Sequence, residues 1–206
     1  MNREYYIKLL DEFQKIMAEN RDYLIDLDRV VGDGDLGLTM SDGFLAAYQA
    51  AKESPETDIG KLLYTAGKAM STAVPSTMGT LMASGLMQAG KVLKGKTETE
   101  NADLVTFFAA FEDGVMARGK AKIGEKTFLD GLDPAVDALK RSISSGDTLS
   151  TAAVKAVCAA NEGFQKTTEM VAIHGRAATR GEASRSLEDP GAAVALLMIR
   201  AFQKTI

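Results

Sequence analysis

Residues 78–93 read MGTLMASGLMQAGKVL, and this stretch decides the fold class. Its apolar residues recur every three or four positions, at Met78, Leu81, Met82, Leu86, Ala89 and Leu93. That spacing is typical of a helix with one buried face, because 3.6 residues complete each turn. Similar spacing recurs almost throughout the chain, and no stretch shows the period-two alternation of a strand. The sequence therefore predicts an all-α protein.

Helix caps and breakers divide the chain into about eight predicted helices. Asp147-Thr148 offers a side-chain cap, and Asp189-Pro190 combines a cap with proline at the first helical position. The predicted helices cover residues 3–25, 37–51, 59–73, 78–93, 102–118, 127–142 and 149–170, and a last helix begins at 189–190. No repeat, linker or low-complexity tract interrupts this series, so we expect a single domain over residues 1–206.

Composition and charge limit the classes of function. The chain has 206 residues, 46% hydrophobic and 25% charged, which is typical of a globular protein with a sizeable core. Its net charge of −4 predicts no nucleic-acid or anionic-membrane partner. No apolar run approaches the roughly 18 residues of a membrane span, and the first residues lack the apolar core of a secretory signal. We therefore expect a cytoplasmic protein.

The chain has one cysteine and one histidine, which restricts its chemistry. Cys158 lies among small apolar residues, so we expect it to be buried and inert. His174 is alone, so a metal site with several histidines is excluded, and a Ser-His-Asp triad would have to use this single loop residue.

Four loops are richer in glycine than ordinary connectors, at residues 31–37, 74–79, 118–126 and 174–191. They occupy alternate junctions between the predicted helices. In an up-and-down antiparallel bundle, alternate junctions lie at the same end. The connectivity therefore predicts that these four loops meet and form a site.

Three carboxylates lie within the loop that follows the first predicted helix, at Asp28, Asp33 and Asp35. Glycine-rich backbone lets such side chains converge, although at about 5 Å and an effective dielectric near 20 each pair repels by roughly 3 kcal/mol. A bound divalent cation would offset this repulsion. Because only oxygen ligands are at hand, Mg²⁺ is the first choice if phosphates complete its shell.

Three other interpretations of this loop compete with the metal site. Gly32, Gly34 and Gly37 match a dinucleotide-binding pattern, but that pattern needs a strand before it and is rejected. A calcium loop would need Glu at its twelfth position, where the chain has Phe44, and is rejected too. A plain Asp-Gly turn with Asp35 capping the next helix remains open.

Six sequence motifs span nearly the whole chain. They are LDR at 27–29 with GDGDLG at 32–37, RGKAKIGEKT at 118–127, DGLDP at 130–134, RA at 176–177, GEAS at 181–184 and DPGA at 189–192. With these motifs in family order, the chain resembles the nucleotide-binding L subunits of bacterial dihydroxyacetone kinases. The resemblance implies a closed barrel of eight antiparallel helices, with a nucleotide, ADP or ATP, and two Mg²⁺ ions held by loops at one end.

The resemblance also implies individual site residues. Asp28, Asp33 and Asp35 would be the metal ligands, and Arg176 would face the phosphates and stabilise the transferring group. The implied nucleotide contacts are Leu36, Gly37, Leu38, Thr39, Thr77, Met78, Gly119, Phe128, Arg176, Asp189, Pro190 and Gly191.

By this resemblance, a phosphohistidine carrier of the phosphotransferase system, the M-type subunit, phosphorylates Mg-bound ADP in place. The phosphoryl group then passes to dihydroxyacetone held on a separate K subunit. An ATP-dependent kinase subunit and a non-catalytic nucleotide sensor are the alternatives, and a homodimer stays open.

Three positions depart from the common family pattern. Leu36 stands where a histidine is common, residues 75–78 replace a Gly-Ala-Ser-Gly stretch, and Leu187-Glu188 replaces a polar His-Gln pair. These changes motivate the hypothesis of a different short ketose, such as a tetrulose.

Overall fold

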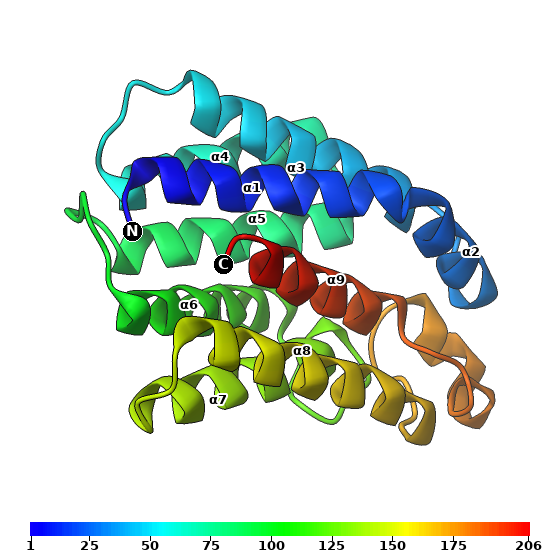
Figure 1. Ribbon diagram of the computed structural model, residues 1–206. Helices are drawn as coiled ribbons and strands as arrows, with labels where there is room; N and C mark the ends of the chain where they lie inside the picture. Colours follow the sequence, from blue (N-terminus) through cyan, green and yellow to red (C-terminus); the bar gives the residue numbers. More distant parts are fainter.

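The computed structural model describes all 206 residues and is all-α. Its only β feature is an isolated bridge between Asn2 and Glu98. Nine α-helices and two 3₁₀ helices follow one another (Figure 1). Their bounds are α1 Arg3–Glu19, α2 Arg21–Val31, α3 Leu36–Glu53, α4 Ile59–Ala73, α5 Thr77–Val92, α6 Asn101–Gly119, α7 Phe128–Ser144, α8 Leu149–Lys166, η1 Thr167–Glu169, η2 Arg176–Ser184 and α9 Pro190–Lys204.

The predicted count of eight helices is wrong, because residues 3–25 do not form one helix. The chain breaks at Asn20, between α1 and α2. The Asn20 side-chain amide donates to the carbonyl of Ile16 at 2.8 Å, and so competes with the helix's own backbone for that acceptor. The second helix runs in a different direction from α1 (Figure 1), and it ends at the carboxylate loop. A further difference is η2, which occupies residues expected to be loop.

The long helices pack in chain order around one hydrophobic core of 51 buried residues. Contacts join α1 to α3 and then each helix to the next through α9, and α9 packs in turn against α1. Phe107, Phe108 and Phe111 on α6 supply much of the aromatic interior, with ring centroids 4.9 Å apart for Phe107 and Phe108. Cys158 is exposed on α8, so the expectation of a buried cysteine is wrong.

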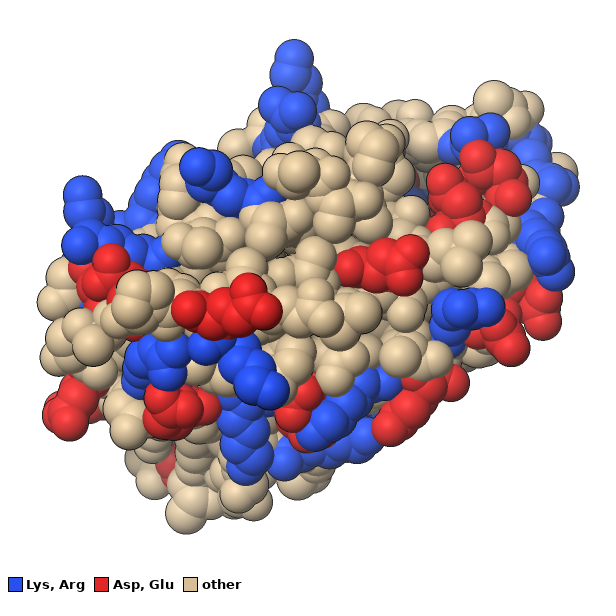
Figure 2. Space-filling view, turned by 90° about the horizontal axis from the view of Figure 1, so that it is seen from above, with Lys and Arg blue, Asp and Glu red and all other residues tan.

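The surface carries charges of both signs. On the face shown in Figure 2, Lys and Arg side chains alternate with Asp and Glu, and no broad basic area is present. None of the helices is both long and apolar enough to cross a membrane.

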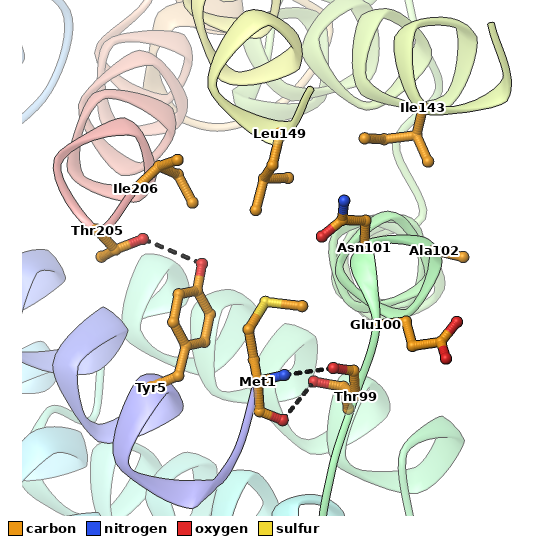
Figure 3. Close-up of a pocket in the computed structure, with 10 residues that line it drawn as sticks. All are labelled: Met1, Tyr5, Thr99, Glu100, Asn101, Ala102, Ile143, Leu149, Thr205 and Ile206. Atoms are coloured by element: carbon orange, nitrogen blue, oxygen red, sulfur yellow. Dashed lines mark hydrogen bonds between the residues drawn. The ribbon is translucent and has the colours of Figure 1, made fainter. Parts of the chain in front are cut away.

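The two ends of the helical assembly differ. The short connectors and both termini lie at one end, and α2, η2 and the glycine-rich loops lie at the other (Figure 1). A hollow of about 670 Å³ lies at the terminal end. There the Tyr5 hydroxyl and Thr205 Oγ1 are 3.0 Å apart and the Met1 amine donates to the Thr99 carbonyl (Figure 3). Glu100 is the only charged side chain in its lining, so this hollow offers little chemistry.

Candidate functional site

A larger cleft of about 1040 Å³ opens at the opposite end of the helices. Its lining comes from the segments 28–36, 71–81, 115–129, 174–177 and 189–191. All four glycine-rich loops therefore contribute to one cavity, as the alternation of the helix junctions predicts. We take this cleft as the candidate functional site.

Asp28, Asp33 and Asp35 converge at one edge of the cleft. Each offers a carboxylate oxygen, and these oxygens lie within 4.8 Å of one another. The loop folds back onto Asp28 in the last turn of α2, because the backbone N–H groups of Gly34 and Asp35 donate to Asp28 Oδ2 at 2.9 and 3.1 Å. Gly34 has a φ of +76°, a left-handed conformation that favours glycine.

Asp35 occupies the N-cap position of α3, but its side chain makes no capping hydrogen bond. The alternative in which Asp35 is only a helix cap is therefore wrong. Its carboxylate stays free for a ligand. Partial burial, followed by the nearby charges of Asp33 and Asp28, raises the pKa of Asp35, and Arg176 opposes this shift.

Arg176 lies beside the aspartates, with its Nη2 atom 2.5 Å from Asp33 Oδ2. One guanidinium leaves two negative charges of the three aspartates uncompensated. The three aspartates offer only oxygen ligands and keep two uncompensated negative charges beside a glycine-rich loop. They therefore fit a hard divalent cation such as Mg²⁺.

Four helices begin at the cleft: α3 at Leu36, α5 at Thr77, α7 at Phe128 and α9 at Pro190. The first N–H groups of a helix lack intrahelical acceptors, and the helix dipole adds partial positive charge there. A cleft surrounded by four such termini beside a cation site favours an anionic ligand with several oxygens, such as a phosphate chain.

Nine of the expected nucleotide contacts line the cleft, namely Leu36, Thr77, Met78, Gly119, Phe128, Arg176, Asp189, Pro190 and Gly191. Gly37, Leu38 and Thr39 do not. They follow Leu36 along α3, so their side-chain positions turn away from the cleft. A Cβ atom on Gly37 would collide with the carbonyl oxygen of Arg21, Leu38 is 43% exposed, and Thr39 is buried.

Asp189 combines a structural and a site position. Its Oδ2 accepts from the Ala192 N–H at 2.7 Å, which caps α9, and the residue also lines the cleft. Burial raises the pKa of Asp189 to about 7, and the charge of Asp130 adds to this shift, while Lys126 opposes it. Asp189 therefore titrates close to neutral pH.

Lys126 is a cleft residue whose role sequence reasoning missed. Its side chain is almost completely buried, and it lies at a φ of +60°, which costs a non-glycine residue about 1–2 kcal/mol. Its ammonium nitrogen lies 2.5 to 3.3 Å from five backbone carbonyl oxygens, so its three N–H groups are shared among the carbonyls of Thr167, Met170, Ser184, Arg185 and Leu187. Backbone acceptors leave no side-chain pattern in a sequence, so only the lysine within the quoted 118–127 motif marked this position.

Residues 167–188, which we call the strap, run from η1 to the start of α9 and carry Arg176. Glu125 holds the outer side of the strap, since its Oε2 lies 2.6 Å from His174 Nε2 and its carbonyl accepts from the Ile173 N–H. His174 lines the cleft, and the partner of its ring is Glu125 rather than a serine. The hydroxyl of Ser184 accepts from the Ala172 N–H at 2.9 Å and closes the strap on itself.

Comparison with known proteins is consistent with this site. Residues 30–204 match the family model of the DAK2 domain. The chain belongs to the DAK2 family. It is 30% identical over 99% of its length to the "PEP-dependent dihydroxyacetone kinase 1, ADP-binding subunit DhaL" of Listeria innocua, covering 97% of that protein. The corresponding subunit of Escherichia coli is also 30% identical, over 97% of this chain and 95% of that protein.

Other relatives of this DAK2 domain are longer. The "L-erythrulose 1-kinase" of Mycolicibacterium smegmatis is 33% identical over 95% of this chain, which spans 34% of that protein. The fold matches the dihydroxyacetone kinase of C. freundii with a TM-score of 0.75 at 20% identity, over 97% of this chain and 34% of that one. A structure of the same kinase "in complex with AMP-PNP and Mg2+" matches with a TM-score of 0.72 at 21% identity, over 97% of this chain and 33% of that one.

One departure from the common family pattern has a structural explanation in this DAK2 domain. Leu187 packs against a small apolar cluster of Val31, Ala172 and Ala177. Val31 is the last residue of α2, directly before the carboxylate loop. The leucine therefore ties the strap, by apolar contact, to the edge of the cleft where the three aspartates converge.

Proposed function

We propose that this DAK2 domain is the nucleotide-binding L subunit of a dihydroxyacetone kinase. In this proposal it holds Mg-ADP, which a phosphohistidine carrier of the phosphotransferase system phosphorylates in place. The phosphoryl group then passes to dihydroxyacetone on a separate K subunit. The observation that carries the proposal is the convergence of three aspartates and one arginine on a cleft where four helices begin. The two DhaL relatives, similar over nearly their full lengths, support it.

In this proposal some residues supply charge to the site and others position the nucleotide. Asp28, Asp33 and Asp35 would hold Mg²⁺, two ions in our proposal, and bound Mg²⁺ would neutralise the phosphates of the nucleotide. The helix N-termini at Leu36, Thr77 and Phe128 would donate N–H groups to phosphate oxygens. Pro190 has no N–H group, so it would line the nucleotide with Met78, Gly119, Asp189 and Gly191. Gly37, Leu38 and Thr39 would act by shaping the start of α3.

Arg176 is the proposed catalytic residue. Its guanidinium already lies at the aspartates, so it is placed to stabilise charge on the transferring phosphoryl group. The apolar part of the cleft, at Leu81, Val115 and Ala121, suits a nucleobase, which binds by apolar contact. The protein supplies no nucleophile in this reaction.

Several finer features belong to the same proposal. The cyclic order of helix contacts supports a closed barrel with the nucleotide site at one end, formed by residues 1–206 as one domain. The K subunit and the M-type carrier would be its partners in the cytoplasm. Nucleic acid and membrane play no part in the reaction as we propose it, which is compatible with a homodimer.

A second candidate is the phosphorylation of a tetrulose by ATP. Relatives named L-erythrulose kinases, 33% and 31% identical over 95% and 92% of this chain, favour it, as do the departures at Leu36, 75–78 and 187–188. A kinase assay with the cognate K subunit, supplied with dihydroxyacetone or erythrulose, separates the two substrates. Turnover of dihydroxyacetone alone would exclude the second candidate.

The proposal is tested by the nucleotide that purified, desalted protein releases on denaturation, with and without earlier EDTA treatment. We expect near-stoichiometric ADP that EDTA removes. A protein that is empty and also binds neither added Mg-ADP nor Mg-ATP would contradict the proposal.

A further inference from the structure

The buried ammonium of Lys126 has an unusual set of partners. It is hydrogen-bonded to uncharged backbone oxygens only, at 2.5 Å from Leu187, 2.6 Å from Thr167, 2.7 Å from Ser184, 3.1 Å from Arg185 and 3.3 Å from Met170. No carboxylate forms an ion pair with it. Asp189 acts on Lys126 only at a distance, without an ion pair. Burial of a charge that no carboxylate contacts is costly, so these hydrogen bonds must replace the water that the ammonium has lost.

All five acceptors belong to the strap, 41 to 61 residues further along the chain. They flank Arg176 on both sides, and the last one lies two residues before Asp189. One ammonium group therefore joins the beginning and the end of the segment that carries Arg176, with no acceptor between Met170 and Ser184.

The strap has few other attachments of comparable strength. Its apolar anchor is only the small cluster of Ala172, Ala177 and Leu187 with Val31. Segments with little buried apolar surface open readily, so polar attachments control their stability. Apart from Lys126, those of the strap include the contacts of Glu125 with His174 and Ile173 and the ion pair of Arg176 with Asp33, and of these only Lys126 joins both ends of the segment. The left-handed backbone of Lys126 supports the same conclusion, because glycine would adopt that conformation without strain, and only the lysine side chain reaches the carbonyls.

We propose that Lys126 is a positioning residue that holds the strap in place, so that Arg176 lies at the carboxylates where the phosphates would bind. This inference rests on the proposed function. Lys126 acts through Arg176 and the strap backbone, and it need not touch the transferring group itself.

The first test compares Lys126→Met with Lys122→Met. The methionine keeps most of the stem of Lys126 but removes the donor, and Lys122 is an exposed lysine of the same loop that makes no side-chain hydrogen bond in the structure. We expect Lys126→Met to raise amide hydrogen exchange across residues 170–188 by about tenfold or more, with α5 and α6 unchanged. Trypsin cleavage at the exposed Arg176, Arg180 and Arg185 should rise in parallel, and Lys122→Met should behave like wild type.

The second test is a double-mutant cycle in the assembled kinase. If Lys126 acts by placing Arg176, Lys126→Met should lower the rate of phosphoryl transfer by about tenfold or more in wild type, and by less than about twofold in an Arg176→Ala background. The proposal would be overturned if the two substitutions lowered the transfer rate independently, so that their fold-losses multiplied in the double variant. Unchanged hydrogen exchange in the strap of Lys126→Met would also overturn it.

If Lys126→Met does not fold, Lys126→Arg provides the test of whether Lys126 holds the strap. Arginine keeps the positive charge but spreads its donors over a plane, so it cannot serve five carbonyls around one point. We expect a folded protein with faster exchange in the strap alone, and wild-type exchange would contradict the proposal. Hydrogen exchange and trypsin cleavage require no bound nucleotide. A wild-type protein that binds no nucleotide would therefore contradict the proposed function, whereas the exchange and cleavage measurements would still test the role of Lys126.

Discussion

The two ends of the helical assembly use the same residue type, aspartate, in opposite ways. At the terminal end, Asp103 and Asp147 have partners: Lys96 and Lys155 donate to them at 2.6 and 2.5 Å. These hydrogen bonds lower the pKa of both aspartates. At the cleft end, burial raises the pKa of Asp35 and Asp189.

This difference separates carboxylates that stabilise the fold from carboxylates available for chemistry. A carboxylate whose hydrogen-bonding capacity is filled by N–H groups and lysine gains stability and has little left for a ligand. A carboxylate crowded by others stays costly until a cation binds. The raised pKa of Asp35 thus agrees with the geometry of the cleft, where three carboxylates converge without a capping or lysine partner for Asp35.

The largest effect should come from exchanging one carboxylate at each end. Asp33→Asn removes a ligand and a charge from the cleft, so we expect the Kd for Mg-ADP to rise by about 100-fold or more. Asp103→Asn at the terminal end should leave that Kd unchanged and lower the melting temperature, because it removes an ion pair and half of a capping box. Calorimetric titration with Mg-ADP measures both. Equal losses of binding in the two variants would break the comparison.

Removing Arg176 should affect transfer more than binding. For Arg176→Ala we expect a fall of about 1,000-fold in the rate of phosphoryl transfer, the scale of arginines that stabilise the transition-state charge. Mg-ADP should stay bound, because the three aspartates remain. The measurement is a coupled assay with the partner subunits beside a nucleotide titration. Unchanged transfer with intact partner binding would favour the alternative of a nucleotide sensor.

The sequence predicts much of this arrangement because its signals are local. Helical periodicity and caps gave the bounds of α3 to α7 and the start of α9 to within a few residues. The spacing of Asp28, Asp33 and Asp35 predicted that these three carboxylates converge. The helix break at Asn20 was missed because it coincides with a hydrogen bond from one side chain to a backbone carbonyl, and the helical periodicity continues through that residue. The role of Lys126 was missed because its partners are carbonyls distant in the chain, and every residue has a carbonyl.

The two ends should also give opposite pH dependence of stability. The pKa of Asp189 is raised to about 7 in the fold, so the folded protein binds a proton that the unfolded chain releases above its ordinary pKa of 3.8. Its contribution to stability therefore falls as pH rises from about 4 to about 7, by about 1.4 kcal/mol for each pH unit in that interval. The lowered pKa of Asp103 gives stability that is present above 3.8 and is lost on acidification.

Asp189→Asn tests this directly, because asparagine also caps helices and resembles the protonated acid. We expect the variant to lose the decline in stability between about pH 4 and 7 and to be at least as stable as wild type at about pH 8. Urea unfolding at a series of pH values measures it, with Asp103→Asn as the matched variant. A variant that declines as wild type does would show that Asp189 is ionised in the fold.

The smallest expected change in stability comes from removing one side-chain contact at each end of the helical assembly. Leu187→Gln restores a polar residue to the position where the chain departs from the family pattern and removes the leucine from the cluster with Val31, Ala172 and Ala177. Because Leu187 is only partly buried, we expect a loss of about 1 kcal/mol in unfolding free energy and faster hydrogen exchange in the strap. Tyr5→Phe is the matched change at the terminal end, where it removes the hydrogen bond to Thr205 and also costs about 1 kcal/mol. Only Leu187→Gln should weaken Mg-ADP binding, because the strap contacts the carboxylate loop and the terminal hollow lies at the opposite end of the helices. Equal effects of the two variants on binding would mean that the two ends are energetically coupled through the helices.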